Sequence, residues 1–135
     1  MEDYKGFKLP VEGTDKIRPD LLETFPCEPL DGADQVIEHL TEEFSSVCPF
    51  SGLPDYATVS VQFVPDKLAV ELKSLKYYYM SYRSVGIFQE HMIQLVYKHL
   101  FEAMKPKWLR VEVTYNIRGG IETSNYIDSA ENLED

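Results

Sequence analysis

Residues 56–64 read YATVSVQFV, and the pattern of this stretch decides the fold class. Apolar side chains stand at every second position from Ala57 to Phe63, and Thr, Ser and Gln fill the positions between them. A period of two with β-branched residues predicts a strand that has one face in the core. Pro65 and Asp66 predict a turn, and apolar residues alternate again over 68–72. We therefore expect a β-hairpin in this part of the chain.

The period changes after Leu72. Apolar residues recur at helical spacing from Phe88 to Ala103, and Pro106 ends the run. This pattern predicts an amphipathic helix of about 17 residues. A shorter helix is expected over 74–83, so two helices follow the first strands.

Strands return after the helices. Residues 109–115 alternate between apolar and polar, and the RGG at 118–120 predicts a turn or bulge before a last short strand. Residues 36–44 are ambiguous between strand and helix, and we assign them to a strand. The order is then β-β-α-α-β-β, which indicates an α+β fold with an antiparallel sheet and helices on one face. Such a sheet leaves two open edges, so we expect a symmetric ring of subunits rather than a monomer.

The 135 residues are enough for one domain with a single core. Residues 1–30 contain four prolines and no sustained period, so we expect an extended arm. Residues 31–124 are expected to form the folded domain. Residues 125–135 are acidic, and we expect a frayed tail there.

Composition narrows the class of protein. No apolar run approaches the roughly 20 residues needed to span a bilayer. The first ten residues, MEDYKGFKLP, lack the apolar segment of a signal peptide. Two cysteines without a CxxC motif predict neither a disulfide framework nor a zinc site. We therefore expect a cytoplasmic protein with reduced thiols, no bound metal and no membrane contact.

The net charge of −10 is unevenly distributed. Residues 1–47 sum to −8 and residues 119–135 to −5, whereas residues 48–118 sum to +3. An acidic surface repels polyphosphate, so direct binding of nucleic acid is not expected. The basic middle suits a small anion such as a phosphorylated cofactor, although an ordinary solvated charge pattern gives the same sums.

Cys48 lies in SVCPFSGLPD, residues 46–55, and Asp55 follows beyond Gly52 and Pro54. A turn there would bring the carboxyl group back toward the thiol. A thiolate is a strong nucleophile, but near its ordinary pKa it needs help to ionise. Free cysteines are more often buried packing residues, so the residues alone leave both interpretations open.

The stretch ELKSLKYYY, residues 71–79, contains Lys73 and Lys76 on one helical face with Ser74 between them. Two lysines near a helix start suit a phosphate, and a solvated lysine face is the alternative. Glu71 and Glu90 could each accept paired hydrogen bonds from the N–H/NH₂ edge of a guanine-like ring. Glutamate in a first helical turn is also ordinary capping chemistry.

Together these motifs are more specific. Over about residues 20–122 the chain resembles the NADPH-dependent 7-cyano-7-deazaguanine reductases, the nitrile reductases of queuosine biosynthesis, in their short single-module form. The resemblance rests on FSSVCPFSGLPD (44–55), VELKSLKYYYMSYR (70–83), GIFQE (86–90) and RGGI (118–121). It implies the tunnelling fold, in which β-β-α-α-β-β units assemble into rings, here a decamer of two pentamers.

The resemblance also implies a mechanism. Cys48 attacks the nitrile carbon of a small deazapurine substrate and forms a covalent thioimide, with Asp55 as proton donor. Two NADPH molecules then reduce the thioimide to the aminomethyl product. The substrate residues it implies are Val70, Glu71, Leu72, Gln89 and Glu90. The residues expected at NADPH are Lys73, Ser74, Lys76, Tyr77 and Arg118.

The chain departs from the family pattern at two positions. Gln89 stands where members often have His, and Gln cannot titrate. Met92 stands where some members have a cysteine that protects the nucleophile as a disulfide, so this protection is absent unless Cys27 replaces it.

Three alternatives stay open. Amidine-forming relatives act on tRNA but lack the two lysines. GTP cyclohydrolases of the same fold need a zinc site. A non-catalytic purine- or pterin-binding ring protein would not need Cys48 and Asp55.

Overall fold

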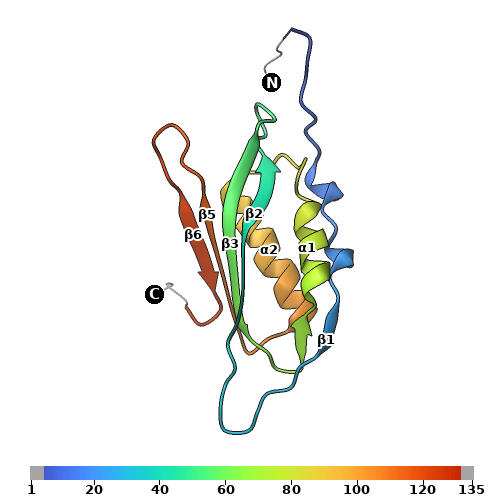
Figure 1. Cartoon of the computed structure of the whole chain (residues 1–135), viewed down its shortest axis with the longest axis vertical. Coiled ribbons are helices and arrows are strands. Elements are labelled where there is room, and N and C mark those ends of the chain that lie inside the picture. Colours follow the sequence, from blue (N-terminus) through green and yellow to red (C-terminus); the bar gives the residue numbers. More distant parts are fainter. Residues whose placement is uncertain (1–4, 132–135) are drawn as a thin grey trace.

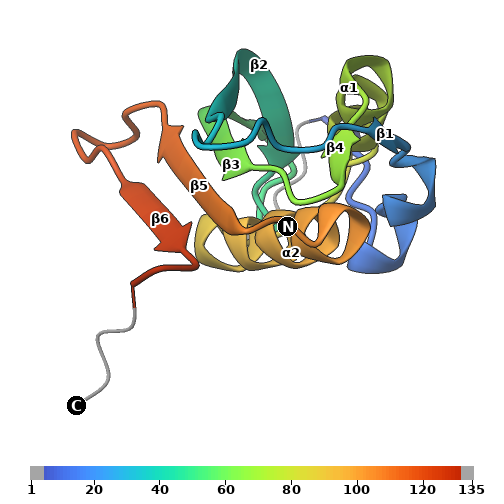
Figure 2. The ribbon, with the colours of Figure 1, turned by 90° about the horizontal axis from the view of Figure 1, so that it is seen from below.

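The computed structural model describes residues 5–131, which form a four-stranded antiparallel sheet with two α-helices on one face (Figure 1). The strand order is β2-β3-β5-β6, with bounds Ile37–Val47, Pro54–Val64, Trp108–Tyr115 and Ser124–Asp128. Helices α1 (Leu72–Met80) and α2 (Gln89–Met104) stand between β3 and β5 in the chain. α2 packs against β5 and β6, and α1 packs against β2 (Figure 2). The predicted α+β class and the β-β-α-α-β-β order of the sheet and its helices are confirmed.

The core lies between the sheet and the helices. The alternating apolar residues of β3 are fully buried and pair in register with β5, so that Val61 stands opposite Val111. The helices contribute residues at helical spacing on the facing side. The main core residues are Val59, Val61, Phe63, Leu75, Tyr78, Met92, Val96, Leu100, Leu109, Val111 and Val113. The period of two in YATVSVQFV therefore decides which face of the sheet is buried.

Strand β2 contains a bulge that explains its ambiguous pattern. Its register with β3 passes from Thr41 opposite Val59 to Phe44 opposite Ala57, so residues 42–43 face a single partner position. The inward side chains are consequently three residues apart at this point, which mimics helical spacing. Beyond the bulge the alternation resumes, and Ser46 is again fully buried.

The predicted hairpin between β3 and the next apolar segment is wrong. β4 (Leu68–Val70) pairs with β1 (Thr24–Pro26) in a separate two-stranded sheet. Strand β3 already has β2 on one side and β5 on the other, so no edge is left for β4. The first helix also begins earlier than predicted, at Leu72, and ends at Met80 rather than at 83.

The arm and the tail are more ordered than predicted. Within the arm, two 3-10 turns cover Thr14–Lys16 and Pro19–Leu21, and β1 follows. In the tail, residues 125–128 belong to β6, contrary to the expectation of fraying. The reason is that Asp128 accepts hydrogen bonds from the Trp108 indole and from Arg110, at 2.8 and 3.2 Å. Residues 1–4 and 132–135 of the expected arm and tail lie outside the described residues.

Candidate active site

Cys48 directly follows β2, in the loop that leads to β3. Its N–H donates to the Leu53 carbonyl, and its own carbonyl accepts from the Gly52 N–H, both at 2.9 Å. Gly52 has a φ of +74°, a left-handed conformation that favours glycine. The loop therefore turns back sharply, and Asp55 pairs with Ser46, only two residues from Cys48. The register therefore places Asp55 beside the end of β2 from which the Cys48 loop begins.

The surroundings of Cys48 favour its thiolate. Burial opposes ionisation of this half-buried thiol, but hydrogen bonding from Ser51, Phe50 and Arg118 outweighs it and lowers the pKa of Cys48. The Ser51 hydroxyl and the backbone N–H groups of the loop all act in the same direction. A half-exposed thiol with a lowered pKa fits a nucleophile better than a packing residue.

At Asp55, in contrast to Cys48, the effect of burial on the pKa is larger than that of the hydrogen-bond partner. Its carboxyl group is buried, and this burial raises its pKa even though the Arg118 guanidinium, an ion-pair partner, opposes the shift. Arg118 is held by a tight turn in which Gly119 and Gly120 both have positive φ, and Arg118 and Ile121 exchange two backbone hydrogen bonds of 3.0 Å. The carboxyl group can therefore stay protonated to higher pH than an exposed aspartate.

The start of α2 lies beside the Cys48 loop. The Ile87 N–H donates to the Val47 carbonyl at 3.3 Å, and the rings of Phe50 and Phe88 are 5.7 Å apart. Gln89 lines a cavity of about 430 Å³ together with Tyr115, Asn116, Arg118, Gly119, Ile121 and Thr123. Its side-chain oxygen is buried, and among the described residues nothing donates a hydrogen bond to it. This acceptor is available to the N–H of a ligand.

Glu90 occupies the first turn of α2 and is exposed, so its carboxylate benefits from the positive end of the helix dipole. Its charge and that of Asp55 both contribute to raising the pKa of Tyr115, after burial, to about 12. Five of the predicted residues therefore form one cluster, which we call the thiol cluster: Cys48, Asp55, Gln89, Glu90 and Arg118.

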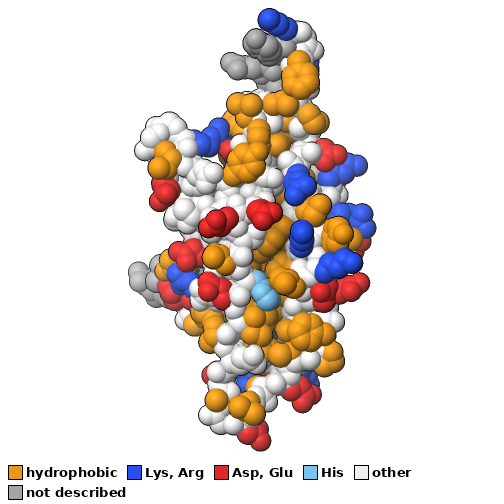
Figure 3. All heavy atoms as spheres, viewed as in Figure 1, with side chains coloured by type: hydrophobic (Ala, Val, Ile, Leu, Met, Phe, Trp, Pro, Cys, Tyr) orange, Lys and Arg blue, Asp and Glu red, His pale blue; other side chains and the backbone are white. Residues whose placement is uncertain are grey.

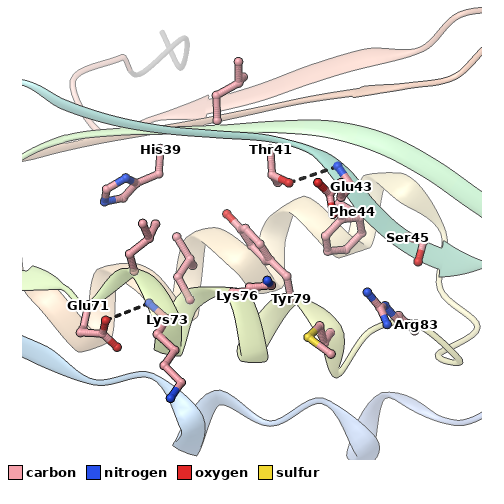
Figure 4. Close-up of a pocket in the computed structure, with 14 residues that line it drawn as sticks. His39, Thr41, Glu43, Phe44, Ser45, Glu71, Lys73, Lys76, Tyr79 and Arg83 are labelled. Carbon is pink, nitrogen blue, oxygen red and sulfur yellow. Dashed lines mark hydrogen bonds between the residues drawn. The ribbon is translucent and has the colours of Figure 1, made fainter.

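The other predicted residues gather elsewhere, along α1. A second cavity, of about 540 Å³, lies between β2 and α1 (Figure 4). Of the predicted residues, Glu71, Leu72, Lys73 and Lys76 line it. The side chains that prediction did not include are His39, Leu40, Thr41, Glu43, Phe44, Ser45, Leu75, Tyr79, Met80 and Arg83. Figure 4 shows Glu71 at the His39 end of this cavity and Arg83 at the Ser45 end.

Glu71 and Ser74 begin helix α1. The Glu71 carboxylate accepts from the backbone N–H groups of Lys73 and Ser74, both at 2.9 Å, and these bonds lower its pKa. The buried Ser74 hydroxyl accepts from the Glu23 N–H at 2.9 Å and donates to the Glu71 carbonyl at 2.7 Å. Val70, just before them, is buried in the core. These contacts hold the backbone of residues 70–74 in one conformation. The residues predicted there for substrate and for cofactor are therefore fixed relative to one another.

The cavity along α1 suits an anion. Lysine and arginine side chains gather over this side of the molecule (Figure 3). Among the described residues Lys73, Lys76 and Arg83 have no carboxylate within ion-pair distance. The Lys73 ammonium points away from β2 and lies 5.9 Å from the centre of the exposed Tyr77 ring. The Tyr79 hydroxyl is buried and has no hydrogen-bond partner within residues 5–131. Lys76 and Arg83 bring positive charge to the cavity, which Glu43 and Glu71 also line.

One chain does not bring the two groups together. His39 lines the α1 cavity near Glu71, and eight residues of β2 stand between it and Cys48. At about 3.3 Å per residue, this strand places the Glu71 end of the cavity roughly 30 Å from Cys48. Ser45, at the other end of the cavity, is only three residues before Cys48. Glu71 and Cys48 therefore do not face one pocket within a single chain.

A family model described as "QueF-like protein" matches residues 54–134, more than half of the chain. The chain belongs to the QueF-like protein family.

Curated relatives of this QueF-like chain have one name in common. A protein of Thermotoga petrophila is 49% identical over 97% of this chain and 94% of its own length. A protein of Caldicellulosiruptor bescii is 43% identical over 90% of this chain and 92% of its own. Both are named NADPH-dependent 7-cyano-7-deazaguanine reductase.

A solved structure has the same fold as this QueF-like chain. It is the apo form of an archaeosine synthase QueF-Like, with a TM-score of 0.67 and 24% identity. The match covers 73% of this chain and 97% of the other. At this identity the likeness concerns the fold.

Two residues beside the thiol cluster, Ser46 and Ser51, were not among the predicted site residues. Ser46 is fully buried, and its hydroxyl lies 3.5 Å from that of the buried Tyr115. Ser51 acts on Cys48 through its hydroxyl and N–H. The signal for Ser46 is present in the sequence, because a hydroxyl continues the inward-facing positions at the end of β2. The bulge concealed it by breaking the alternation.

Two absences concern residues 5–131 of this QueF-like chain. No helix there has the length and apolarity needed to cross a membrane. His, Cys, Asp and Glu side chains in the same range form no group of three that could hold a metal ion.

Proposed function

We propose that this chain is an NADPH-dependent 7-cyano-7-deazaguanine reductase, which converts a nitrile to an aminomethyl group in tRNA queuosine biosynthesis. The main supporting observation is the pairing of Cys48, whose pKa is lowered, with Asp55, whose pKa is raised. Relatives of that name match nearly the whole chain. Two groups whose pKa values are shifted toward thiolate and neutral acid suit nucleophilic attack followed by protonation.

Cys48 begins the reaction. Its thiolate attacks the nitrile carbon, a C–S bond forms, and one π bond of the C≡N group is lost. The electron pair moves to nitrogen, which takes a proton from Asp55, and a thioimide results. Burial of Asp55 keeps its proton available, while Arg118 stabilises the carboxylate after transfer.

Reduction follows in two steps. NADPH would supply one hydride to the thioimide carbon, and a second NADPH, bound after the oxidised cofactor has left, would supply another to the imine carbon. After the first hydride the C–S bond breaks, Cys48 leaves as thiolate and an imine remains. The second hydride and a proton on nitrogen give the amine. Lys73 and Lys76 would hold the cofactor phosphates, with Ser74 and Tyr77 as further contacts, because α1 presents cations beside a cavity. Arg118 lies in the thiol cluster, so it would reach the cofactor from a neighbouring subunit.

The substrate is held by two sets of residues. The buried Gln89 oxygen accepts from an N–H of the deazaguanine, and Glu90 accepts from its N–H/NH₂ edge. Glu71 and Leu72 form the opposite wall, and Val70 supports them from the core. Because this wall lies roughly 30 Å from Cys48 in one chain, it comes from a neighbouring subunit.

A ring of subunits provides that neighbour. Strands β2 and β6 are the edges of the sheet, and β2 presents eleven residues. Pairing of edges between copies hides both and closes the ring. We propose a decamer of two pentameric rings, with each active site between subunits.

The test is NADPH oxidation by the purified protein with 7-cyano-7-deazaguanine. We expect two NADPH consumed per nitrile and the aminomethyl product by mass spectrometry. A parallel reaction with labelled ammonia and no NADPH should yield no amidine. Amidine formation in that reaction, or absence of NADPH oxidation, would overturn the proposal.

A further inference from the structure

The segment Leu9–Glu12 of the N-terminal arm crosses directly over the loop that presents Cys48. A Cβ atom added at Gly52 would lie 3.0 Å from the Leu9 Cβ and 3.1 Å from a Val11 methyl. Contacts this short show that the arm packs on the backbone of the loop without a gap. Gly52 is therefore needed both for its positive φ and for the room it leaves to the arm.

Val11 also contacts the strand-like segment before α2. A Cβ atom at Gly86 would lie 2.5 Å from the other Val11 methyl and 3.2 Å from the Cα of Pro49. Pro49 is the residue after Cys48. Val11 is thus wedged between Gly52 and Gly86, with the loop closing on Gly86 from the side of Pro49.

Backbone hydrogen bonds hold the arm in place. The Glu12 N–H donates to Ser84 at 2.7 Å, and the Gly86 N–H donates back to Glu12 at 2.9 Å. On its other side, residues 84–87 bond to Val47, the last residue of β2, at 3.0 and 3.3 Å. Both bridges are parallel. The arm, the segment 84–87 and the end of β2 therefore lie side by side in that order. Cys48 directly follows β2.

We propose that residues Leu9–Glu12 form a positioning strap, which holds the Cys48 loop in the conformation that attacks the nitrile. The proposal rests on the proposed function for the identity of the electrophile only. The strap acts through the loop backbone and does not touch the substrate. The N–H groups of Phe50 and Ser51 and the Ser51 hydroxyl keep the Cys48 thiol acidic only while the loop keeps its shape. Releasing the strap removes that support.

The test uses the full chain with Cys27→Ala, so that Cys48 is the one thiol. The rate of its alkylation by iodoacetamide is measured against pH for three further variants: Val11→Ala, Val11→Thr and Leu30→Ala. Val11→Ala should raise the pH midpoint by roughly half to one unit, which slows alkylation about three- to tenfold below the midpoint. Val11→Thr keeps the branched shape and should restore the parent profile. Leu30, 75% exposed, is the control and should change nothing.

Circular dichroism of each variant shows whether it is folded. Should Val11→Ala not fold, Leu9→Ala serves in the same assay. An unchanged midpoint in a folded Val11→Ala or Leu9→Ala variant would overturn the strap. The assay needs neither nitrile nor NADPH. A shifted midpoint in a protein that reduces no nitrile would therefore support the strap and overturn the proposed function instead.

Discussion

At the scale of single residues, Arg118 is the link between Asp55 and Cys48. It forms an ion pair with the Asp55 carboxyl group and hydrogen bonds toward Cys48. A guanidinium favours the ionised form of both acids, so it lowers both pKa values. For Cys48 this adds to the effect of Ser51, and for Asp55 it opposes burial.

Replacing Arg118 tests this balance. In Arg118→Gln we expect the pKa of Cys48 to rise toward its ordinary value and that of Asp55 to rise further, because the same cation is lost from both. The thiolate fraction at neutral pH should fall, and ultraviolet absorbance of the thiolate against pH measures it. Lys98→Gln, on the exposed face of α2, is the control. A Cys48 midpoint that stays unchanged would contradict the role given to Arg118.

Cys48 itself is tested by the covalent step. Mixing protein and 7-cyano-7-deazaguanine without NADPH should add one substrate mass to a peptide that contains Cys48, because no hydride is present to resolve the thioimide. Cys48→Ala should abolish the adduct and turnover, whereas Cys27→Ala should leave both nearly intact. Peptide mass spectrometry is the measurement, and an adduct on Cys27 would refute the assignment.

At the scale of elements, the first turn of α1 is fixed by hydrogen bonds, and its exposed face carries two lysines. Lys73 and Lys76 are exposed and three residues apart, so both reach the same ligand. Each charge-assisted hydrogen bond to a phosphate is worth about 1–3 kcal/mol. Replacing either lysine with Ala should raise the apparent NADPH requirement roughly 5- to 150-fold. Steady-state kinetics measures this.

The thiol cluster provides the control for the lysines. Adduct formation without NADPH should barely change in either lysine variant, because Cys48 and Glu90 are intact. Variants that lose the adduct but keep a normal NADPH requirement would show that the cofactor lies elsewhere.

A substitution of Ser74 distinguishes a structural role of its hydroxyl from a role in binding the cofactor. Its hydroxyl accepts from the Glu23 N–H, so Ser74→Ala leaves that donor unpaired near the core. The free energy of unfolding should fall by about 1–3 kcal/mol. Urea denaturation measures this, with Ser81→Ala at the end of α1 for comparison. A large rise in the NADPH requirement with unchanged stability would mean that the hydroxyl binds cofactor directly.

At the scale of the whole molecule, the separation of the thiol cluster from α1 predicts complementation between subunits. Cys48→Ala and Glu71→Gln should each be inactive, yet rings coexpressed from both should regain part of the activity. A neighbouring pair can then supply one intact thiol cluster and one intact α1. Coexpressed Cys48→Ala and Asp55→Asn are the matched control, since both damage the same cluster and no site is complete.

Light scattering on the same samples should show a large ring-based oligomer. A stable monomer with full activity would contradict both the ring and the shared site, because one chain keeps its two groups apart.

The sequence by itself determined the strands of the four-stranded sheet and the two helices. Alternation over residues 57–63 and helical spacing after Phe88 depend on neighbours in the chain, so they are visible without a structure. The proximity of Cys48 and Asp55 also follows from a local turn. The sequence could not reveal that β4 leaves the sheet, because pairing depends on which edges other strands already occupy.

Only the tertiary structure decided how the predicted site residues are grouped. They form two clusters, one at the end of β2 and one along α1, and the length of β2, not spacing in the sequence, sets the distance between Glu71 and Cys48. The arm shows the same limit. Four prolines and no period predict an extended segment, and nothing local indicates that Val11 packs between Gly52 and Gly86. Such contacts join residues far apart in the chain, and only the folded backbone brings them together.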